Sequence, residues 1–542
     1  MTDQSNSNTV SAGVNGLISV SELKDLMSSK REYALFDIRE AGEAEKGQIY
    51  ATTFLPRRLI EFRIPELVPN PDTLLILYDN GPDDGRAELA RQTLMGIGYK
   101  KILVLSGGTA AWIKAGHTLV EGSNVPCKLF GENLHTSEHV PDLTAEELAS
   151  WRDSGKKMLI CDIRTPTEHE SAHVPDSRPA PSFDIAQSLG DFLKKDVPVI
   201  VHCAGRTRSI IACQALRELG LENVYALKNG TMGWILAGHE LDETGSGEPF
   251  TPSPESIKLF EDRAAKITAD ANITSMDQQA LQDAIAARKQ QKSNVYVFDV
   301  RPLKDSLNGR IPGSFAVPGG QAVQRADDFI AVKMAPIVFI DDREGRANMT
   351  ASFFRKMGYP NVHVLSGGVN GWVEAGKELV TGRGRPSPLG LQNAKTASHV
   401  LSSKQAQQKM ADSPEMIVIN VDHSMNFSSG HIAGSSWLAR GFLEQRIANI
   451  SDNKQTEILV TCSGGTQSCL ANATLIALGY SNTHLLDGGV RAWKKAGLPV
   501  ETGGVNPTEV EDLVLPPFAR GQKGMQKYLD WEEKLVKSNI EG

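Results

Sequence analysis

The stretch Val199-Ile-Val-His-Cys-Ala-Gly-Arg-Thr-Arg-Ser209 decides how the rest of the chain is interpreted. An apolar run over residues 197–201 is typical of a buried strand. Residues 210–219 carry apolar side chains at helical spacing and precede Gly220, which is typical of a helix that ends at a glycine. The pattern predicts that Cys203 lies at the end of a strand, where a short loop leads into a helix N-terminus.

This position suits an anion and a thiolate. Backbone N–H groups of such a loop point inward, and the helix dipole favours negative charge. Two arginines add positive charge that would stabilise a thiolate and hold an anionic donor, and a glycine lets the loop curl tightly. The predicted site comprises Cys203 as nucleophile with Ala204, Gly205, Arg206, Thr207, Arg208 and Ser209 around it. The alternative is a buried cysteine beside two solvated arginines.

Length and composition describe an ordinary globular chain. Its 542 residues predict roughly three to five domains at about 100–200 residues each. A net charge of −8 gives no reason to expect nucleic acid or an anionic membrane as a partner. No apolar run approaches the roughly 18 residues of a membrane span. Six cysteines without a disulfide pattern favour a reducing, cytoplasmic location.

One signature occurs four times: an apolar strand, a glycine element, a tryptophan, then Ala-Gly. The copies are LSGGTAAWIKAG (105–116), LKNGTMGWILAG (227–238), LSGGVNGWVEAG (365–376) and LDGGVRAWKKAG (486–497). Upstream of each lies a strand that ends in a polar residue, at 34–39, 158–164, 295–301 and 416–422. Alternating strands and helices predict parallel α/β sheets with helices on both faces. Ligands of such sheets bind at the carboxyl ends of strands, where Cys203 is placed.

The Asp-Ile-Arg strand end, the strand–Cys–loop–helix unit and the terminal glycine–tryptophan element together resemble the rhodanese family, four times in tandem over about residues 15–505. The resemblance implies a sulfurtransferase that works through a cysteine persulfide. Its partners would be a small anionic sulfur donor such as thiosulfate, and a thiol, cyanide or a protein as sulfur acceptor. No cofactor is expected. No metal site is expected either, because the histidines are scattered.

The predicted organisation is four rhodanese-like domains and two further segments. They are domain 1 (15–125), domain 2 (138–250), a linker helix (251–272), domain 3 (273–385), domain 4 (397–505) and a C-terminal tail with a short helix (506–542). Asp79 and Asp341 occupy the nucleophile position in domains 1 and 3. An aspartate is no sulfur nucleophile and repels an anionic donor, so these two domains are predicted to be inactive and to pack against, or shape, an active neighbour.

Domain 4 carries a second candidate site. Cys462 matches Cys203 in position and loop length, but Gly465 and Gln467 replace the two arginines. A weak or vestigial site is expected. Cys127, Cys161, Cys213 and Cys469 are expected to be core residues.

Two other functions stay open. Three degenerate repeats would suit a sulfur carrier or scaffold for a protein partner. His202-Cys203 and Ser209 also resemble the signature of cysteine phosphatases and arsenate reductases, which have five residues between cysteine and arginine. Only four residues separate Cys203 from Arg208, which favours a sulfurtransferase. An oligomeric state is not predicted.

Overall fold

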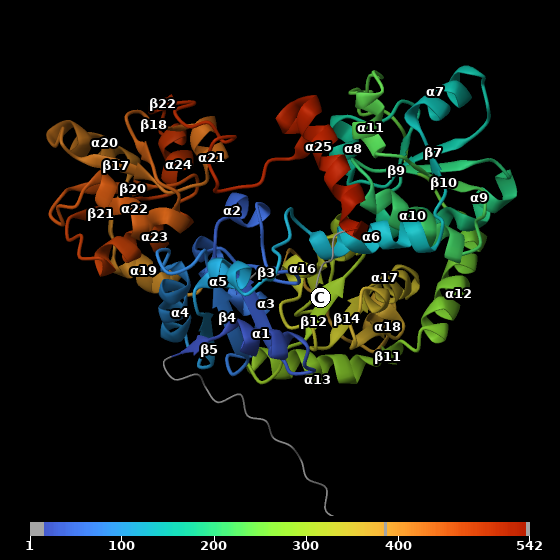
Figure 1. Cartoon of the computed structure of the whole chain (residues 1–542), viewed down its shortest axis with the longest axis horizontal. Coiled ribbons are helices and arrows are strands. Elements are labelled where there is room, and N and C mark those ends of the chain that lie inside the picture. The colour runs from blue at the N-terminus through green and yellow to red at the C-terminus, as the bar shows by residue number, and fades with distance from the viewer. Residues whose placement is uncertain (1–15, 384–386, 538–542) are drawn as a thin grey trace, which may run out of the picture.

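The computed structural model describes residues 16–383 and 387–537. The chain folds into four α/β domains, each built on one five-stranded sheet (Figure 1). The predicted fold is confirmed. The outer ends of the predicted first and third domains and of the tail, at residues 15, 384–385 and 538–542, lie outside the described residues.

Each sheet has the same strand order, which in domain 1 is β1-β5-β4-β2-β3, and all its neighbours run parallel. The strands of domains 1 and 2 are β1 (Leu17–Ile18), β2 (Tyr33–Asp37), β3 (Thr53–Phe54), β4 (Leu74–Tyr78), β5 (Ile102–Leu105), β6 (Asp142–Leu143), β7 (Leu159–Asp162), β8 (Arg178–Pro179), β9 (Val199–His202) and β10 (Val224–Leu227). Those of domains 3 and 4 are β11 (Thr274–Met276), β12 (Tyr296–Asp299), β13 (Phe315–Ala316), β14 (Ile337–Ile340), β15 (Val362–Leu365), β16 (His399–Leu401), β17 (Ile417–Asn420), β19 (Ser436–Trp437), β20 (Ile458–Thr461) and β21 (Thr483–Leu486); β18 (His431–Ile432) and β22 (Val500–Glu501) pair separately.

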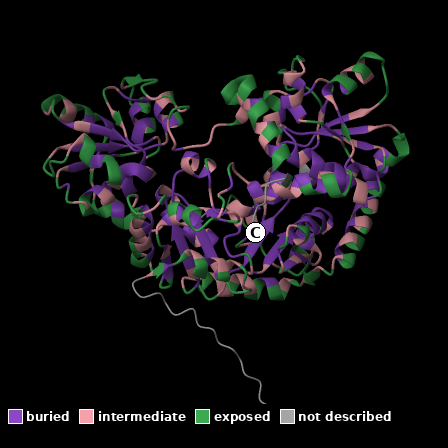
Figure 2. Cartoon of the chain, in the orientation of Figure 1, coloured by how far each residue is buried: buried purple, intermediate pink, exposed green. Residues whose placement is uncertain are grey.

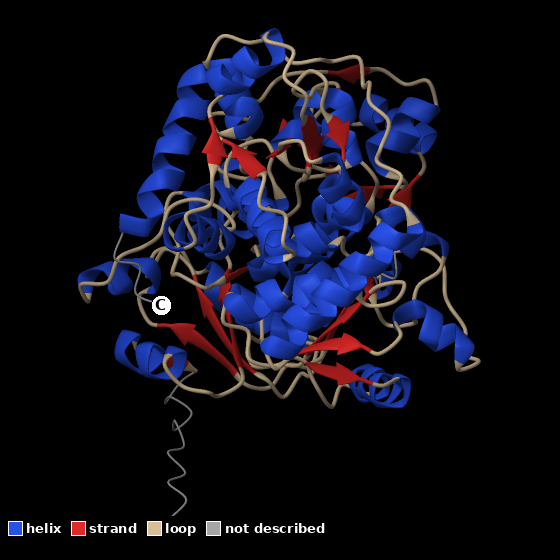
Figure 3. Ribbon diagram, turned by 90° about the vertical axis from the view of Figure 1, so that its right-hand side faces the viewer, coloured by secondary structure: helices blue, strands red, loops and turns tan. Residues whose placement is uncertain are grey.

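Helices flank the sheets, as the turned view shows (Figure 3). In domains 1 and 2 they are α1 (Val20–Met27), α2 (Ala41–Glu45), α3 (Ile60–Leu67), α4 (Arg86–Gly96), α5 (Gly108–Lys114), α7 (Ala145–Asp153), α8 (Pro166–Ser171), α9 (Leu189–Lys195), α10 (Thr207–Glu218) and α11 (Gly230–Leu236). In domains 3 and 4 they are α13 (Gln278–Lys289), α14 (Leu303–Asn308), α15 (Gly319–Gln324), α16 (Ala326–Phe329), α17 (Gly345–Lys356), α18 (Gly368–Glu374), α19 (Leu391–Ala397), α20 (Ser403–Asp412), α21 (Ser424–Ser429), α22 (Leu443–Ile450), α23 (Thr466–Ala477) and α24 (Gly489–Lys495). Short 3-10 helices are η1 (Arg57–Leu59), η2 (Ser182–Ser188), η3 (Arg440–Phe442), η4 (Pro517–Arg520) and η5 (Leu535–Lys537).

The central strands are buried on both faces, which explains their continuous apolar sequence (Figure 2). One apolar cluster extends through domains 1, 2 and 3, and each of these domains has a further cluster of its own. The main clusters of domain 4 are separate from it. Polar contacts join domain 4 to domain 1, among them ion pairs of Arg57 with Glu444 at 2.7 Å and of Arg440 with Glu61 at 2.5 Å. No helix of the described residues is long and apolar enough to cross a membrane.

Three helices outside the repeats connect the domains. The predicted linker helix is α12 (Pro254–Asp270), which packs along α9 and α17. The predicted tail helix is α25 (Gly521–Lys534), which leaves domain 4 and packs on α6 and α11 beside domain 2 (Figure 1). The third helix, α6 (Val125–Ser137), joins domains 1 and 2 and packs on α10; it was not predicted.

The glycine–tryptophan element fixes the loop that carries the nucleophile position. In domain 2, Thr231 N–H donates to the Cys203 carbonyl at 2.9 Å and Met232 N–H to the Ala204 carbonyl at 3.0 Å. Gly230 lies so close that a Cβ atom there would be 2.2 Å from the Cys203 oxygen. The element is therefore a clamp on the loop, and only glycine fits at this point of the clamp.

Substitution of Gly230 is expected to be far more damaging than substitution of Gly238, its matched control at the other end of α11. Both glycines have left-handed φ values, +54° and +86°, but a Cβ at Gly238 would meet no atom within 4 Å. Gly238→Ala should cost about 1–2 kcal/mol for backbone strain alone. Gly230→Ala should cost about 2–5 kcal/mol, because steric overlap adds to that strain. Thermal unfolding measures both; equal losses would contradict the clamp.

Candidate active site

Cys203 lies where the sequence placed it, directly after β9 and four residues before α10 begins at Thr207. Its side chain is buried, and among the described residues the hydrogen-bond partner of its Sγ is the Ser209 hydroxyl at 3.5 Å. Ser209 Oγ in turn donates to the Arg206 carbonyl at 2.9 Å. Within the described chain, no N–H group of residues 204–209 donates to this sulfur. The sulfur therefore leaves these N–H groups unused.

Arg208 stands beside the nucleophile but is already paired. Its guanidinium donates to both oxygens of Glu168, at 2.8 and 3.0 Å. Burial would raise the pKa of Glu168, but this guanidinium outweighs burial and lowers the pKa to about 2. The carboxylate is therefore ionised at neutral pH and offsets the charge that Arg208 brings to the sulfur.

Arg206 has partners that the sequence did not predict. Its guanidinium binds Glu132 of α6 at 2.8 and 2.9 Å, Glu533 of α25 at 2.9 Å, and the Asn229 side chain at 3.1 Å. Two carboxylates from outside domain 2 therefore already pair with Arg206, and its role in holding an anionic donor stays a prediction. Through these contacts Arg206 fastens α6 and α25 to the loop.

The end of β7 forms a polar network beneath the site. Asp162 accepts hydrogen bonds from Arg164 and His169, and Arg164 also donates to the Ala172 carbonyl. The predicted structural role of the Asp-x-Arg pair is consistent with these contacts. His202 is fully buried without a hydrogen-bond partner in the described chain, and burial lowers its pKa to about 4, so it is neutral at pH 7.

Domains 1 and 3 fill the same loop with their own carboxylates. Asp79 accepts from the N–H groups of Gly81 and Ala87, at 3.0 and 2.9 Å. Asp341 accepts from the N–H groups of Asp342 and Arg346, at 2.8 and 2.7 Å, and from Arg346 Nε at 2.8 Å. Each aspartate is an internal anion in the position where a substrate anion would bind.

In domain 4, backbone N–H groups of the loop point at the Cys462 sulfur, an arrangement that we call a cradle. The N–H groups of Gly465 and Ser468 donate to Cys462 Sγ at 3.1 and 3.3 Å, and the Ser468 hydroxyl lies 3.4 Å from it. Gly465 has a left-handed φ of +88°, whereas Arg206 at the matching position of domain 2 has −115°. The glycine that replaces the arginine is what turns this N–H toward the sulfur.

Positive charge also remains near the Cys462 loop, contrary to what the loop sequence suggested. Arg491 of α24 brings Nη2 to 3.7 Å from the Cβ position of Gly464. Arg440 of η3 donates to Gln467 in the loop at 3.4 Å, while Glu61 and the Arg58 carbonyl of domain 1 hold its other side. Domain 1 thus supports the Cys462 loop through Arg440.

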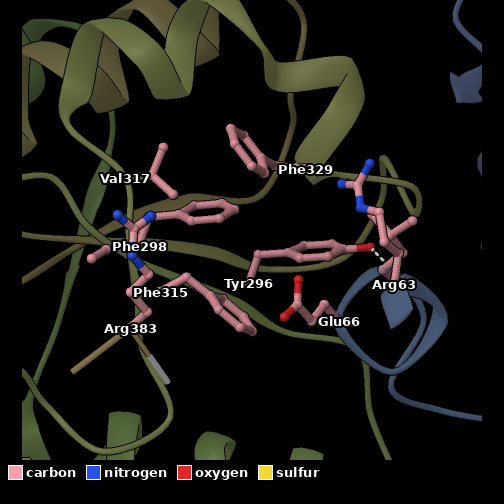
Figure 4. A pocket seen from close by; sticks show the side chains of 10 residues that line it. Arg63, Glu66, Tyr296, Phe298, Phe315, Val317, Phe329 and Arg383 are labelled. Carbon is pink, nitrogen blue, oxygen red and sulfur yellow. Dashed lines mark hydrogen bonds between the residues drawn. The ribbon is translucent and has the colours of Figure 1, made fainter. Parts of the chain in front are cut away.

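The other four cysteines are free and buried. Burial raises the pKa of Cys127, Cys161 and Cys469, and that of Cys213 to about 12, which suits core residues. A separate aromatic pocket lies between α3 and the domain 3 sheet (Figure 4), where Tyr296 donates to the Leu67 carbonyl at 2.6 Å. None of its lining residues belongs to a nucleophile loop.

Removal of the carboxylate that neutralises Arg208 is expected to activate Cys203. Glu168→Gln keeps a side-chain oxygen that can accept from the Thr165 N–H at the start of α8, since glutamine also serves in a capping box. The unpaired guanidinium should then stabilise the Cys203 thiolate and speed its alkylation by iodoacetamide about three- to tenfold at pH 7. Glu170→Gln, on the exposed side of the same helix, is the matched control. An unchanged rate in Glu168→Gln would mean that Arg208 does not act on the sulfur.

Comparisons with known proteins agree with this geometry. The crystal structure of a thiosulfate sulfurtransferase from Pseudomonas aeruginosa superposes with a TM-score of 0.87 at 31% identity, covering 96% of this chain and 97% of that one. The thiosulfate sulfurtransferase GlpE of Ectopseudomonas mendocina is 31% identical over 102 residues, which are 19% of this chain and 89% of GlpE.

A probable adenylyltransferase/sulfurtransferase, MoeZ of Mycobacterium tuberculosis, is 29% identical over 109 residues. That match spans 20% of this chain and only 28% of the length of MoeZ. The model of the rhodanese-like domain matches residues 19–115, 144–237, 278–375 and 402–496, which together exceed half of the chain. The chain is therefore a member of the rhodanese-like sulfurtransferase family with four such domains.

Proposed function

We propose that the protein is a thiosulfate sulfurtransferase in which Cys203 carries the transferred sulfur as a persulfide. The single observation that carries the proposal is the contrast among the four loops. In domains 1 and 3 the loop N–H groups bind the aspartate of their own loop, whereas in domain 2 no N–H group of residues 204–209 donates to the sulfur and a cysteine takes the aspartate's place.

The proposed reaction has two steps, and each forms one bond to sulfur and breaks another. The Cys203 thiolate attacks the outer sulfur of thiosulfate; a sulfur–sulfur bond forms to Cys203, the bond to the sulfonate sulfur breaks, and sulfite leaves with the electron pair. An acceptor thiolate or cyanide then attacks the terminal sulfur of the persulfide, and Cys203 leaves as the thiolate. The loop N–H groups and the α10 N-terminus stabilise the anions of both steps.

The arginines around Cys203 are already paired with carboxylates, which affects how an anionic sulfur donor can bind. Glu168 neutralises Arg208, and Glu132 and Glu533 neutralise Arg206. The backbone cradle, rather than a free guanidinium, is therefore the main anion-binding element that we assign to the donor. The donor is a small anion under this proposal, and the acceptor is a thiol, cyanide or a protein thiol.

A second sulfur-bearing residue is proposed in domain 4. Two N–H groups already donate to Cys462 Sγ, and Arg491 lies beside the loop, so a thiolate or persulfide there would be stabilised. Its role would be a second transfer centre in the same chain. Sulfur carriage for a protein partner remains the alternative main role, and oxyanion hydrolysis is the less favoured one.

Turnover with thiosulfate and cyanide, followed as thiocyanate and sulfite, tests the proposal. Cys203→Ser should reduce the rate to about a tenth or less, because the nucleophile is lost. Cys462→Ser should retain most of the rate, and the double variant should have none. An aryl phosphate should not be hydrolysed by any of them.

Full activity in Cys203→Ser would contradict the proposed nucleophile. Phosphate release that disappears in Cys203→Ser would favour the phosphatase alternative. Persulfide formation without turnover to cyanide or a small thiol, but with transfer to a protein thiol, would favour a carrier.

A further inference from the structure

The Cys203 loop is covered by the C-terminal helix. Gly205, Arg206 and Thr207 are all buried, whereas Gly464 of domain 4 and Asn80 of domain 1 are exposed. The domain 3 loop is covered by a different element, because Gly345 lies against Phe260 of α12. In domain 2 that cover comes from α25 and α6 (Figure 1).

Residues of α25 contact the loop at the positions two, three and four residues after the nucleophile. A Cβ at Gly205 would lie 3.5 Å from Tyr528 Cε1 and 3.5 Å from Glu532 Oε2. The Thr207 hydroxyl donates to Glu532 Oε1, and Arg206 binds Glu533 at 2.9 Å. The tail of domain 4 is thereby tied to three consecutive residues of a loop more than 300 positions earlier in the chain.

Few residues of α25 are fully buried. Within Gly521–Lys534 they are Met525, Leu529 and Glu532. Met525 and Leu529 pack with Met232 of α11, and the partly buried Trp531 packs with Val125 of α6 and Leu535 in a second small cluster. Elements with few buried apolar contacts are those that open locally at low free-energy cost.

Glu532 makes the packed position of α25 on the loop less stable. It is fully buried, burial raises its pKa, and Oε2 has no hydrogen-bond partner among the described residues. A buried polar atom without a partner costs free energy that solvent would restore on opening. In this position α25 therefore makes specific polar contacts with the loop but is held by little fully buried apolar surface.

We infer that α25 is a lid on the Cys203 site, which in the seated position admits small sulfur donors and acceptors and excludes a protein acceptor until it is displaced. The inference rests on the proposed function of Cys203 for its meaning, but the contacts of the lid do not depend on that function. The lid packs on three loop residues, Gly205, Arg206 and Thr207. Its own contact residues are Met525, Leu529, Glu532 and Glu533.

Alkylation of Cys203 in the full chain tests the lid without any sulfur chemistry. Two probes are compared by peptide mass, iodoacetamide and a polyethylene-glycol maleimide, with Cys462 in the same digest as internal reference. Leu529→Glu places a charge in the apolar seat and should raise the maleimide rate at Cys203 about tenfold or more, because it raises the open population. Gln522→Glu, exposed in the first turn of α25, should leave it within about twofold.

The iodoacetamide rate at Cys203 and both rates at Cys462 should change little in Leu529→Glu. A maleimide rate at Cys203 that is the same in the wild type and in Leu529→Glu, with the core cysteines still protected, would overturn the lid. Because labelling needs no sulfur donor, this failure is distinct from failure of the proposed sulfurtransferase, which would leave the labelling result intact.

A second measurement covers the case in which Leu529→Glu unfolds domain 2, seen as labelling of Cys161 and Cys213. Hydrogen exchange of the wild-type chain then tests whether α25 opens independently of domain 2. Amides of residues 525–534 should exchange faster than those of residues 211–218 in α10, because the lid opens without its domain. Equal protection of the two helices would overturn the proposal.

Discussion

The close approach of a glycine to one backbone carbonyl holds each of the four nucleophile loops in shape. The N–H groups of Thr109, Thr231, Val369 and Val490 donate to the carbonyls of Asp79, Cys203, Asp341 and Cys462, all at 2.8–2.9 Å. A Cβ on the preceding glycine would lie 2.0–2.4 Å from the same oxygens. The constraint involves only backbone atoms, so it fixes the loop and leaves its first side chain free to vary.

The four domains therefore differ in the side chain at the nucleophile position, which is aspartate in two of them and cysteine in the other two. An aspartate satisfies the N–H groups internally, and under the proposed function such a domain packs against its neighbours and supports them. Domain 1 supports the Cys462 loop through Glu61 and Arg440, and Arg346 of domain 3 binds Asp184 of η2 in domain 2 at 2.8 Å. A cysteine leaves the cradle to a reactive sulfur. One scaffold thus provides both the centres and their supports.

The sequence was sufficient for the sheet fold, the linker and tail helices and the position of Cys203, because these follow from local periodicity and from repetition. It could not show that Arg206 binds Glu132 and Glu533, because these residues come from α6 and α25, far outside the repeat. At Cys462 it showed the loss of an arginine, but not the left-handed backbone of Gly465 or the N–H group that Gly465 donates to the sulfur. Arg491 was missed because it lies on a different element from the loop that it faces.

The most direct test is the mass of the intact chain and its peptides after thiosulfate treatment of the reduced protein. Each persulfide adds one sulfur, ~32 Da. We expect added sulfur on the peptides of Cys203 and Cys462, the first lost in Cys203→Ser and the second in Cys462→Ser. We expect none on Cys127, Cys161, Cys213 or Cys469, which lie in the core. Sulfur on neither loop cysteine, or on the core cysteines alone, would contradict the claim that a cysteine at the nucleophile position marks the reactive domains.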